Sequence, residues 1–496
     1  METKNFLAFD LGAESGRAML GQVDENGQLK ISEWHRFPNL WVQINGRLHW
    51  NLFYLFEQIR LALRKARQEK LNLSGLGIDT WGVDFGLLDR EGHVLTLPYC
   101  YRDRSFPPAM KKYFEKHSAE KLYQLTGIQF MPFNSLFQLY AYLENSPDLV
   151  RLARHLLFIP DLLNYLLTGE KASEITIAST SQILSPFDRK WQSALLEEIG
   201  LSPEILPDLR PTASVLGRLS GWLAEDGLPE VPVIQVASHD TASAVAAAPG
   251  EGQDWVYISS GTWSLVGVEL AEPVVNRESF LANFTNESGL NRTIRFLKNV
   301  SGLWLLQQCR KVWTKKQDLS YEKIVELAAQ AAPFQFLVDP DAPEFLNPED
   351  MTAALRLYAH KTGQKMVEDI GSVARSLLES LALKYRLVVE DLEKITRKKY
   401  NRIHIIGGGS RNYLLNQFTA SATGKVVLAG PDEATSVGNI LTQALAVGLL
   451  ENPAAIRKTI RNSFEIKEFQ PEDTAGWDKA YSRFREILER SDRLIK

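Results

Sequence analysis

Two stretches far apart in the chain share one pattern, an apolar run, a short turn of small residues and a second apolar run. The first covers residues 6–23, with its turn at 12–16, and the second covers 255–270, with its turn at 260–262. Short apolar runs that flank glycine- and serine-containing turns predict strands joined as hairpins. Their similar order and spacing predict a duplicated α/β fold with one hairpin in each half.

The length of the chain favours two domains. Its 496 residues exceed what one hydrophobic core usually supports. The sequence Pro249-Gly250-Glu251-Gly252 is the best candidate boundary, so we expect domains at 1–248 and 249–496. Hydrophobic residues make up 45% and charged residues 23%, which is typical of a soluble globular protein. A net charge of −4 gives no electrostatic reason to expect a nucleic acid or an acidic membrane as partner.

Cysteine content and hydropathy favour a cytoplasmic location. The two cysteines, Cys100 and Cys309, lie far apart, and a chain of this size needs no disulfide to fold. The N-terminus enters a strand pattern directly, without the charged and apolar regions of a signal peptide. No stretch approaches the ~20 apolar residues that span a membrane. Monomer and homodimer both remain open.

The two turns carry residues suited to binding anions. The first combines small residues, a hydroxyl and a guanidinium in Asp10-Leu11-Gly12-Ala13-Glu14-Ser15-Gly16-Arg17, and the second is Ser259-Ser260-Gly261-Thr262. Small residues let backbone N–H groups approach phosphate oxygens closely. Structural hairpins that need glycine for their geometry are an equally good interpretation of each turn taken alone. Neither Gly424-Lys425 nor the glycines at 75–77 and 407–409 complete a P-loop or a dinucleotide fingerprint.

Asp240 is the strongest candidate for acid–base chemistry. An apolar run at 233–237 predicts a buried strand, and a helix is expected over 241–248. A carboxylate between them benefits from the helix N-terminus, although local evidence alone favours a simple N-cap. His239 and Asp84 can likewise be satisfied polar residues at strand ends. The histidines lack metal-ligand spacing and no cysteine cluster occurs, so we expect no zinc site.

Together these segments resemble the FGGY family of carbohydrate kinases. The resemblance implies two domains of the actin/hexokinase-like (ribonuclease H-like) ATPase fold with a cleft between them, and it extends from Asp10 to about Gly448. Within this family, the sequence is most similar to the branch that acts on L-rhamnulose. One departure stands at 137–140, where many members have a Lys-hydrophobe-x-Trp pattern. The matching motifs are DLGAESGR (10–17), GIDTWGVDFGLLD (77–89), ASHDTASAV (237–245), SSGTWSLVGVE (259–269), NFTNE (283–287), FLKNVSGLWLLQ (296–307) and IIGGGSRNYLLNQ (405–417).

The resemblance also implies roles for individual residues. Asp240 would accept the proton of the sugar hydroxyl, and Asp10 would face a magnesium ion through water. The remaining residues would bind the two substrates. Those expected at the ATP phosphates are Ala13, Glu14, Ser15, Gly16, Arg17 and Thr262, those expected at the rest of the nucleotide are Gln307 and Gly408, and those expected at the sugar are Gly82, His239, Asp240, Thr241 and Asn299.

The resemblance therefore predicts a cytoplasmic kinase that uses ATP and Mg²⁺ to phosphorylate the primary hydroxyl of a ketose. L-fuculose and D-xylulose are the alternative sugars. A nucleotide-switched, actin-like structural protein is an alternative of another class, since fold alone does not determine function. The sequence Ser238-His239-Asp240-Thr241 favours the kinase, because a filament protein has no need of it.

Overall fold

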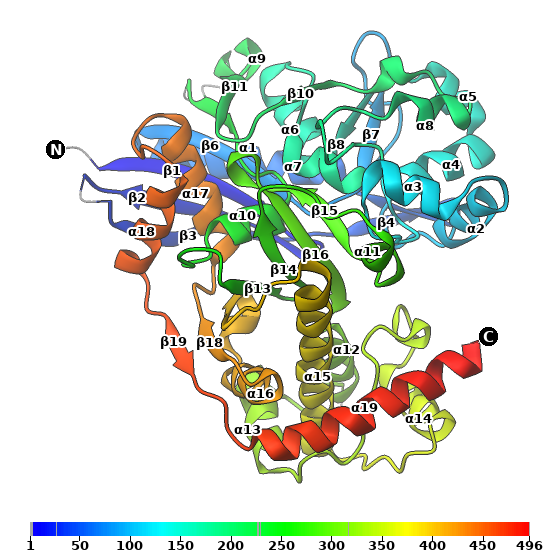
Figure 1. The fold of residues 1–496 in the computed structure, drawn as a ribbon. Coiled ribbons are helices and arrows are strands. Elements are labelled where there is room, and N and C mark those ends of the chain that lie inside the picture. The colour runs from blue at the N-terminus through cyan, green and yellow to red at the C-terminus, as the bar shows by residue number, and fades with distance from the viewer. Residues whose placement is uncertain (1–2, 26, 226–227, 229, 316, 496) are drawn as a thin grey trace. The chain divides into compact units, whose positions relative to one another are not determined.

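The computed structural model describes residues 3–25, 27–225, 228, 230–315 and 317–495 (Figure 1). The chain separates into two compact units, each assembled from three segments. Unit 1 comprises Met1–Pro249, Glu269–Phe296 and Ala434–Ser463, and unit 2 comprises Gly250–Val268, Leu297–Glu433 and Phe464–Lys496. Unit 1 thus takes two segments from beyond residue 249.

A six-stranded sheet forms the centre of unit 1, in the order β11-β12-β6-β1-β2-β3. The strands are β1 (Lys4–Leu11), β2 (Ser15–Val23), β3 (Leu29–Pro38), β6 (Leu73–Thr80), β11 (Ser214–Arg218) and β12 (Pro232–Gln235). β2 pairs antiparallel with β1, which confirms the first predicted hairpin, and β3 pairs antiparallel with β2. β6 runs parallel to both β1 and β12, so the carboxyl ends of these three strands lie at one edge of the sheet.

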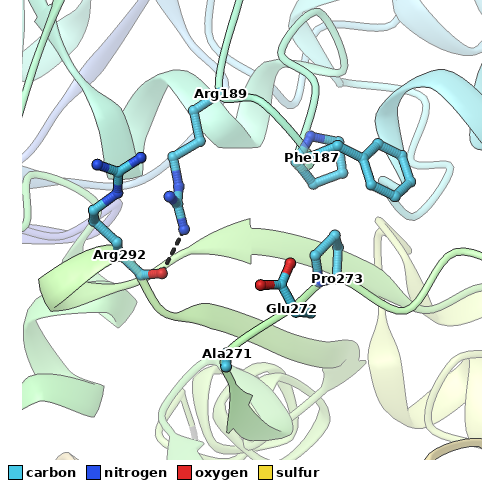
Figure 2. A pocket seen from close by; sticks show the side chains of 7 residues that line it. Phe187, Arg189, Ala271, Glu272, Pro273 and Arg292 are labelled. Atoms are coloured by element: carbon cyan, nitrogen blue, oxygen red, sulfur yellow. Dashed lines mark hydrogen bonds between the residues drawn. The ribbon is translucent and has the colours of Figure 1, made fainter.

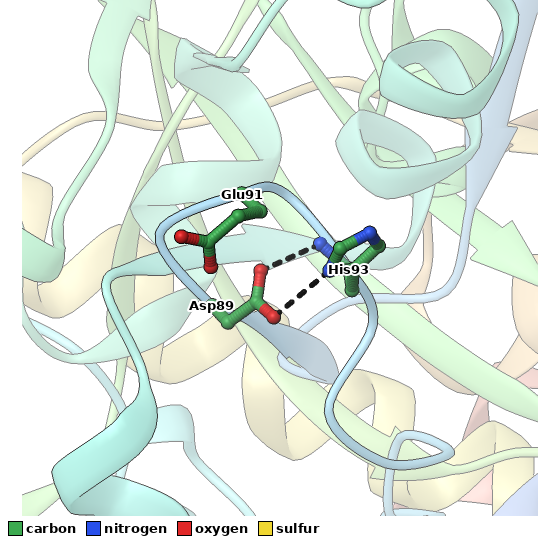
Figure 3. A group of neighbouring side chains, drawn as sticks. All are labelled: Asp89, Glu91 and His93. Atoms are coloured by element: carbon green, nitrogen blue, oxygen red, sulfur yellow. Dashed lines mark hydrogen bonds and ion pairs between the residues drawn. The ribbon is translucent and has the colours of Figure 1, made fainter.

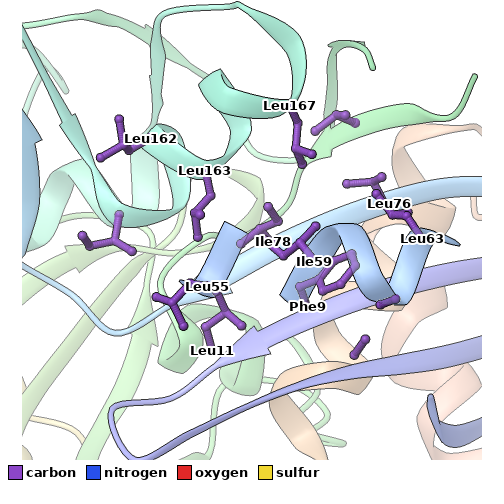
Figure 4. Packing of buried hydrophobic residues seen from close by; sticks show 14 of the residues in the cluster. Phe9, Leu11, Leu55, Ile59, Leu63, Leu76, Ile78, Leu162, Leu163 and Leu167 are labelled. Carbon is purple, nitrogen blue, oxygen red and sulfur yellow. The ribbon is translucent and has the colours of Figure 1, made fainter. Parts of the chain in front are cut away.

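Two helices cover one face of this sheet, α1 (Leu52–Gln68) and α6 (Ile159–Thr168). Successive side chains of a strand point to opposite faces. Leu7, Phe9 and Leu11 of β1 and Leu76 and Ile78 of β6 therefore point to the same face, where they join the leucines of α1 and α6 in a buried cluster (Figure 4). Asn51 caps α1, because its side chain accepts a hydrogen bond from the backbone N–H of Tyr54.

The opposite face of the sheet receives a helix from late in the sequence, α17 (Ala434–Ala446). Gly75 and Gly77 of β6 leave room for it, since a Cβ at Gly77 would lie 2.8 Å from Oδ1 of Asn439. α17 also packs on α10 (Asp240–Ala246). Gly438 permits that contact, because a Cβ there would lie 1.8 Å from the carbonyl oxygen of Ser243.

The remainder of unit 1 forms a second buried cluster, rich in aromatic side chains, and the surrounding loops. Its strands are β4 (Trp41–Ile44), β5 (Arg47–Trp50), β7 (Phe85–Leu88), β8 (His155–Phe158), β9 (Ala172–Glu174), β10 (Asp208–Arg210) and β15 (Thr285–Ser288). Its helices are α2 (Phe106–Lys116), α3 (Ala119–Thr126), α4 (Ser135–Asn145), α5 (Pro147–Leu152), α7 (Ile175–Ala178), η1 (Ser179–Ser181), α8 (Ser193–Glu198), η2 (Pro203–Ile205), α9 (Gly221–Glu225), α11 (Arg277–Leu281), η3 (Leu290–Arg292) and α18 (Pro453–Ser463).

Unit 2 is built on the sheet order β14-β13-β17-β18-β19. These strands are β13 (Trp255–Ser260), β14 (Trp263–Leu270), β17 (Arg402–Ile406), β18 (Val426–Ala429) and β19 (Lys467–Phe469), and β16 spans Ile294–Ser301. The antiparallel pairing of β13 with β14 confirms the second predicted hairpin. The division between the units falls within β14 and β16.

A long helix, α15 (Ile370–Thr396), packs against α13 and α16 in unit 2. The helix begins where Asp369 caps it, by accepting a hydrogen bond from the backbone N–H of Ser372. The other helices are α12 (Trp304–Trp313), α13 (Tyr321–Gln330), η4 (Pro343–Phe345), α14 (Met351–Lys361), η5 (Gly408–Arg411), α16 (Tyr413–Thr423) and α19 (Thr474–Ile495). None of the helices among the described residues is long and apolar enough to cross a membrane.

Candidate active site

Three aspartates gather at the carboxyl edge of the sheet in unit 1. Asp10 of β1 stands in register with Asp79 of β6, on the face that α17 covers. Beyond the end of β12 the chain continues to Asp240, the first residue of α10. The pairing of Thr80 with His239 brings that segment beside β6. Ligand sites in open α/β sheets commonly lie outside the carboxyl ends of parallel strands.

Asp10 is nearly buried and is bound on one oxygen. Its Oδ2 accepts hydrogen bonds from Nη2 of Arg17 at 2.9 Å and from Oγ of Ser436 at 3.2 Å. Arg17 lies directly opposite Asp10 in the first hairpin, so strand register alone brings the two side chains together. The arginine therefore balances the charge of Asp10 and fixes the direction of its carboxylate.

Asp79 is completely buried, yet only one of its oxygens is satisfied. Oδ2 accepts a 2.6 Å hydrogen bond from Nδ2 of Asn439. Oδ1 has no hydrogen-bond partner among the described residues. Burial and the nearby charge of Asp10 raise the pKa of Asp79 well above its usual range, and the bond from Asn439 offsets this only in part. Such a carboxylate gains from a cation placed nearby.

Asp240 keeps one oxygen available for chemistry. Its Oδ1 accepts the backbone N–H of Thr241 at 2.5 Å and the Thr241 hydroxyl at 3.0 Å. Within the described part of the chain, no hydrogen bond falls on Oδ2. The side chain is 29% exposed. Burial raises the pKa of Asp240, the neighbouring imidazole of His239 lowers it and the charge of Asp10 raises it, with a net upward shift.

A buried glutamate, Glu174, binds the backbone of the segment that carries Asp240. Glu174 accepts the backbone N–H of Ser238 at 3.1 Å and those of Thr176 and Ile177 at the start of α7. Oγ1 of Thr176 in turn accepts the backbone N–H of His239 at 3.3 Å. These bonds satisfy backbone donors at the break between β12 and α10. They also fix the position of the backbone that carries Asp240.

The first hairpin turn presents Glu14 and Ser15 to solvent, while Ala13 and Arg17 are half-buried. The side chain of Asn39 donates a 2.8 Å hydrogen bond to the carbonyl of Gly12, which braces the turn. A Cβ at Gly16 would lie 2.3 Å from the ring of Phe37, so glycine is needed there for packing. The turn thus has a structural reason for its glycine and still exposes backbone and a hydroxyl.

Gly82 lies in a strained turn after β6. Its neighbour Val83 has φ of 68°, an uncommon conformation for a β-branched residue. Hydroxyl groups hold this turn, since Oγ1 of Thr180 accepts the backbone N–H of Val83 at 3.0 Å and Ser135 donates to its carbonyl. Strain of this kind persists only where surrounding contacts over-determine the backbone, often beside a ligand site.

Asp84 ends the same turn. It is a buried residue whose hydrogen bonds are satisfied, in line with the structural interpretation of the sequence. It accepts hydrogen bonds from the indoles of Trp50 and Trp81, from the backbone of Tyr101 and from Nε2 of Gln138 at 2.6 Å. Gln138 falls in the segment that departs from the common family pattern. Burial outweighs the four bonds and raises the pKa of Asp84 to about 7.

Unit 2 gathers a second group of the predicted residues around the turn at 260–262. The carbonyl of Thr262 accepts the backbone N–H groups of Gly302 at 3.0 Å and Trp304 at 3.2 Å. Gly409 lies against Ser260, where a Cβ would come 2.0 Å from the serine hydroxyl. A Cβ at Gly408 would meet nothing within 4 Å. The turn, the start of α12 and the glycine loop therefore form one compact group.

Gln307 and Asn299 also belong to unit 2. Gln307 lies on the first turns of α12, and its Oε1 is buried without a partner among the described residues. Asn299 is half-buried on β16. The predicted residues therefore fall into two groups. The group in unit 1 comprises Asp10, the first turn, Gly82 and the segment around Asp240, and the remaining residues form the group in unit 2.

Two other features of unit 1 hold none of the predicted residues. A cavity of about 340 Å³ lies between the segments 186–189 and 271–273, where Arg189 donates a hydrogen bond to the carbonyl of Arg292 (Figure 2). Asp89, Glu91 and His93 form a trio of possible metal ligands in the turn between β7 and α2 (Figure 3). The histidine is 77% exposed and pairs with Asp89, as in an ordinary surface turn.

Comparison with known proteins places this arrangement in a family. Residues 5–247 match the N-terminal domain of the FGGY family of carbohydrate kinases, and residues 256–447 match its C-terminal domain. The chain belongs to the FGGY family of carbohydrate kinases. It is therefore an enzyme of that class, and the expected resemblance and fold class are confirmed.

Several curated FGGY kinases are similar over almost the whole chain. A protein named rhamnulokinase from Bacteroides thetaiotaomicron is 43% identical over 98% of this chain and 99% of its own length. A rhamnulokinase from Bacillus subtilis is 41% identical over 94% of this chain and 96% of its own length. Among solved structures, a xylulose kinase from Lactobacillus acidophilus has a TM-score of 0.82 at 16% identity, with 98% of each chain covered.

Sequence reasoning missed four polar residues of unit 1, Asp79, Glu174, Glu287 and Arg295. Asp79 lies inside a quoted motif, and its even spacing from Gly75 and Gly77 on β6 could have placed it on the face of Asp10. Glu287 also lies inside a quoted motif, but it, Glu174 and Arg295 each contact a residue at least 48 positions away. Only the folded chain reveals them.

Proposed function

We propose that this FGGY kinase transfers the γ-phosphoryl group of ATP to the primary hydroxyl of L-rhamnulose, giving L-rhamnulose 1-phosphate. The observation that carries the proposal is its similarity to curated rhamnulokinases, at 43% and 41% identity over 98% and 94% of the chain. We place the reaction in the cytoplasm, where ATP is abundant and the two buried cysteines remain reduced.

Asp240 is proposed as the base that accepts the proton of the sugar hydroxyl. Its Oδ1 is held by Thr241, so Oδ2 is left to receive the proton. A raised pKa makes it a better base than an ordinary aspartate. Gly82, His239 and Thr241 lie near it in sequence or structure and are proposed to position the sugar. Asn299 of unit 2 is proposed to contact the sugar as well.

The donor set in unit 1 fits a magnesium ion. Asp10 and Asp79 offer carboxylate oxygens, the ligands that Mg²⁺ prefers, and Oδ1 of Asp79 is buried without a partner among the described residues. When bound, the ion would neutralise charge on the phosphate oxygens of ATP. We propose that Asp10 faces the ion through water and that Arg17, together with Asn439 on Asp79, holds these carboxylates in place.

The nucleotide is proposed to contact both groups of residues. Ala13, Glu14, Ser15, Gly16 and Arg17 supply a turn with exposed backbone and hydroxyl for the phosphates. Thr262 would serve the same role from the second hairpin. Gln307, with its unsatisfied Oε1, and Gly408, with open space around it, are proposed to bind the remaining part of the nucleotide.

The substrate is tested by measuring ADP release with L-rhamnulose, L-fuculose, D-xylulose and glycerol at equal concentration. We expect kcat/KM to be at least ~10-fold higher for L-rhamnulose, the discrimination that differing hydroxyl contacts readily provide. A preference for another ketose would refute the choice of sugar but keep the kinase. ADP release that is the same with every sugar and without one would refute sugar phosphorylation itself.

A further inference from the structure

His239 faces two groups that require opposite roles of one ring nitrogen. Its Nδ1 lies 3.1 Å from Nη2 of Arg295, at hydrogen-bonding geometry. The same atom lies 3.3 Å from Oε2 of Glu287. A guanidinium only donates hydrogen bonds, so Arg295 requires a lone pair on Nδ1. A carboxylate would instead require a proton there.

Arg295 is buried and held in place by hydrogen bonds. The residue is completely buried in unit 1. Its Nε donates to the carbonyl of Ser288 at 3.0 Å, and its Nη2 donates to Oε2 of Glu287 at 3.0 Å. Burial would raise the pKa of Glu287, but the charge of Arg295 and the contact with His239 more than offset this and lower it. A buried ion pair of this kind compensates the cost of desolvating each member.

The hydrogen bond at Nδ1 determines whether Nε2, the other ring nitrogen of His239, carries a proton. If Nδ1 accepts from Arg295, a neutral His239 carries its proton on Nε2. Nε2 lies 3.5 Å from Oδ1 of Asp240. The N–H group then points its positive end toward the carboxylate and favours the orientation in which Thr241 also binds Oδ1. With the proton on Nδ1, a lone pair would face the carboxylate instead.

We propose that Arg295 is a positioning residue that selects the Nε2–H tautomer of His239 and thereby holds Oδ2 of Asp240 toward the sugar hydroxyl. Glu287 keeps Arg295 in place, and its carboxylate would accept a hydrogen bond from a protonated Nδ1 if the arginine were absent. The catalytic part of this inference rests on the proposed function of Asp240, whereas the tautomer itself does not.

The tautomer is measured by NMR on the full-length protein with ¹⁵N-labelled histidine. The signals of His239 are assigned as those lost in His239→Gln. We expect Nε2 to be protonated and Nδ1 to be bare in the wild-type protein. In Arg295→Met, Nδ1 should become protonated, because Nδ1–H can then donate a hydrogen bond to the carboxylate of Glu287. A protonated Nδ1 in the wild type, or an unchanged spectrum in Arg295→Met, would overturn the proposal.

Arg295→Met leaves Glu287 buried without its partner, which can prevent folding. The double variant Arg295→Met/Glu287→Gln removes both charges and keeps the test available. Without a guanidinium to set the tautomer, the Nε2–H form should lose its dominance there. Glu287→Gln alone retains Arg295, so His239 should keep its proton on Nε2. A shift to Nδ1–H in that single variant would contradict the role of the arginine.

Kinetics test the catalytic consequence. We expect kcat with the preferred sugar to fall by about 10- to 100-fold in Arg295→Met, as for other residues that orient a reacting group, with KM for ATP unchanged. Arg295→Lys keeps a donor and should recover part of the loss. Arg375→Met removes the arginine of another largely buried pair, with Glu379 in unit 2, and should change stability without changing kcat.

These readouts separate the inference from the function on which it rests. Asp240→Asn with wild-type turnover would refute the role of Asp240, while the NMR result would still decide the tautomer. An inactive Asp240→Asn together with a protonated Nδ1 in the wild type would refute only the role of Arg295.

Discussion

Asn439 donates a 2.6 Å hydrogen bond to Oδ2 of Asp79, although 360 positions separate the two residues. The same amide group donates to the carbonyl of Gly77, and its Oδ1 accepts from Gln443. One asparagine of α17 thus satisfies a buried carboxyl group, a backbone carbonyl and a neighbouring side chain. The position of Asp79 beside Asp10 depends on this helix.

Asn439→Ala should destabilise the protein by about 1–3 kcal/mol, because it leaves the buried Oδ2 of Asp79 without a donor. Urea unfolding measures the change. Asn401→Ala is the matched control, since Asn401 donates a 2.7 Å bond to Asp254 at an exposed site and should cost less than about 1 kcal/mol. Equal losses in the two variants would contradict the importance of burial.

Gly438→Ala should destabilise the protein by at least about 3 kcal/mol. The added Cβ would lie 1.8 Å from the carbonyl oxygen of Ser243, so α17 and α10 would have to move apart. Helix propensity alone predicts the opposite sign, a gain of about 1 kcal/mol. Gly221→Ala, where a Cβ meets nothing within 4 Å, is the control and should be neutral or stabilising. A stabilised Gly438→Ala would show that the two helices pack less closely.

Asp240→Asn should lower kcat by at least ~10²-fold while the KM values for ATP and sugar stay near normal, because only the proton acceptor is lost. Steady-state ADP release measures both parameters. Asp350→Asn is a matched control, as Asp350 also stands at a helix start and caps α14. That variant should retain wild-type kcat. Near-normal turnover in Asp240→Asn would exclude Asp240 as the base.

Asp10→Asn should raise the Mg²⁺ concentration needed for half-maximal activity by about 10- to 100-fold, the range seen when groups that orient a metal are removed. Titration of activity with MgCl₂ at fixed ATP gives this concentration. Asp89→Asn alters the surface trio of Figure 3 and should leave the requirement unchanged. If only Asp89→Asn changed the requirement, the ion would bind in that turn instead.

Asp84 should lower the free energy of unfolding as the pH rises from about 4 to about 7. Its pKa in the folded protein is about 7, against about 4 in an unfolded chain, so the native state holds the extra proton within this window. Stability therefore falls with rising pH, by up to about 4 kcal/mol, and becomes level above pH 7. We expect the unfolding free energy of the wild type, minus that of Asp84→Asn, to decrease over the same range. A difference that is constant with pH would contradict the raised pKa.

Local patterns in the sequence predicted much of the framework. Short apolar runs around small-residue turns gave both hairpins, and the break at 238–240 gave the junction between β12 and α10. Asp240 was recognisable because a carboxylate at such a junction is visible from its neighbours alone. The family motifs then added roles that no single turn could establish.

The supports of the site could not be predicted in the same way. Asn439, Glu174 and Arg295 are polar residues whose partners lie on other segments, and nothing in their own neighbourhoods distinguishes them from surface residues. The expected boundary at 248 also gave no indication that 434–463 would pack with the first segment. That contact depends on glycines of β6 and side chains of α17 that become complementary only after folding.

The late position of α17 in the sequence has a consequence during synthesis. The ribosome completes β1 and β6 long before it reaches residues 434–446. Until then, Gly75, Gly77 and Asp79 lack the helix that covers them in the finished protein. The amino-terminal half can therefore nucleate early but reaches its final form only near the end of translation. A nascent chain halted before residue 434 should remain bound by chaperones rather than accumulate as a separate stable domain.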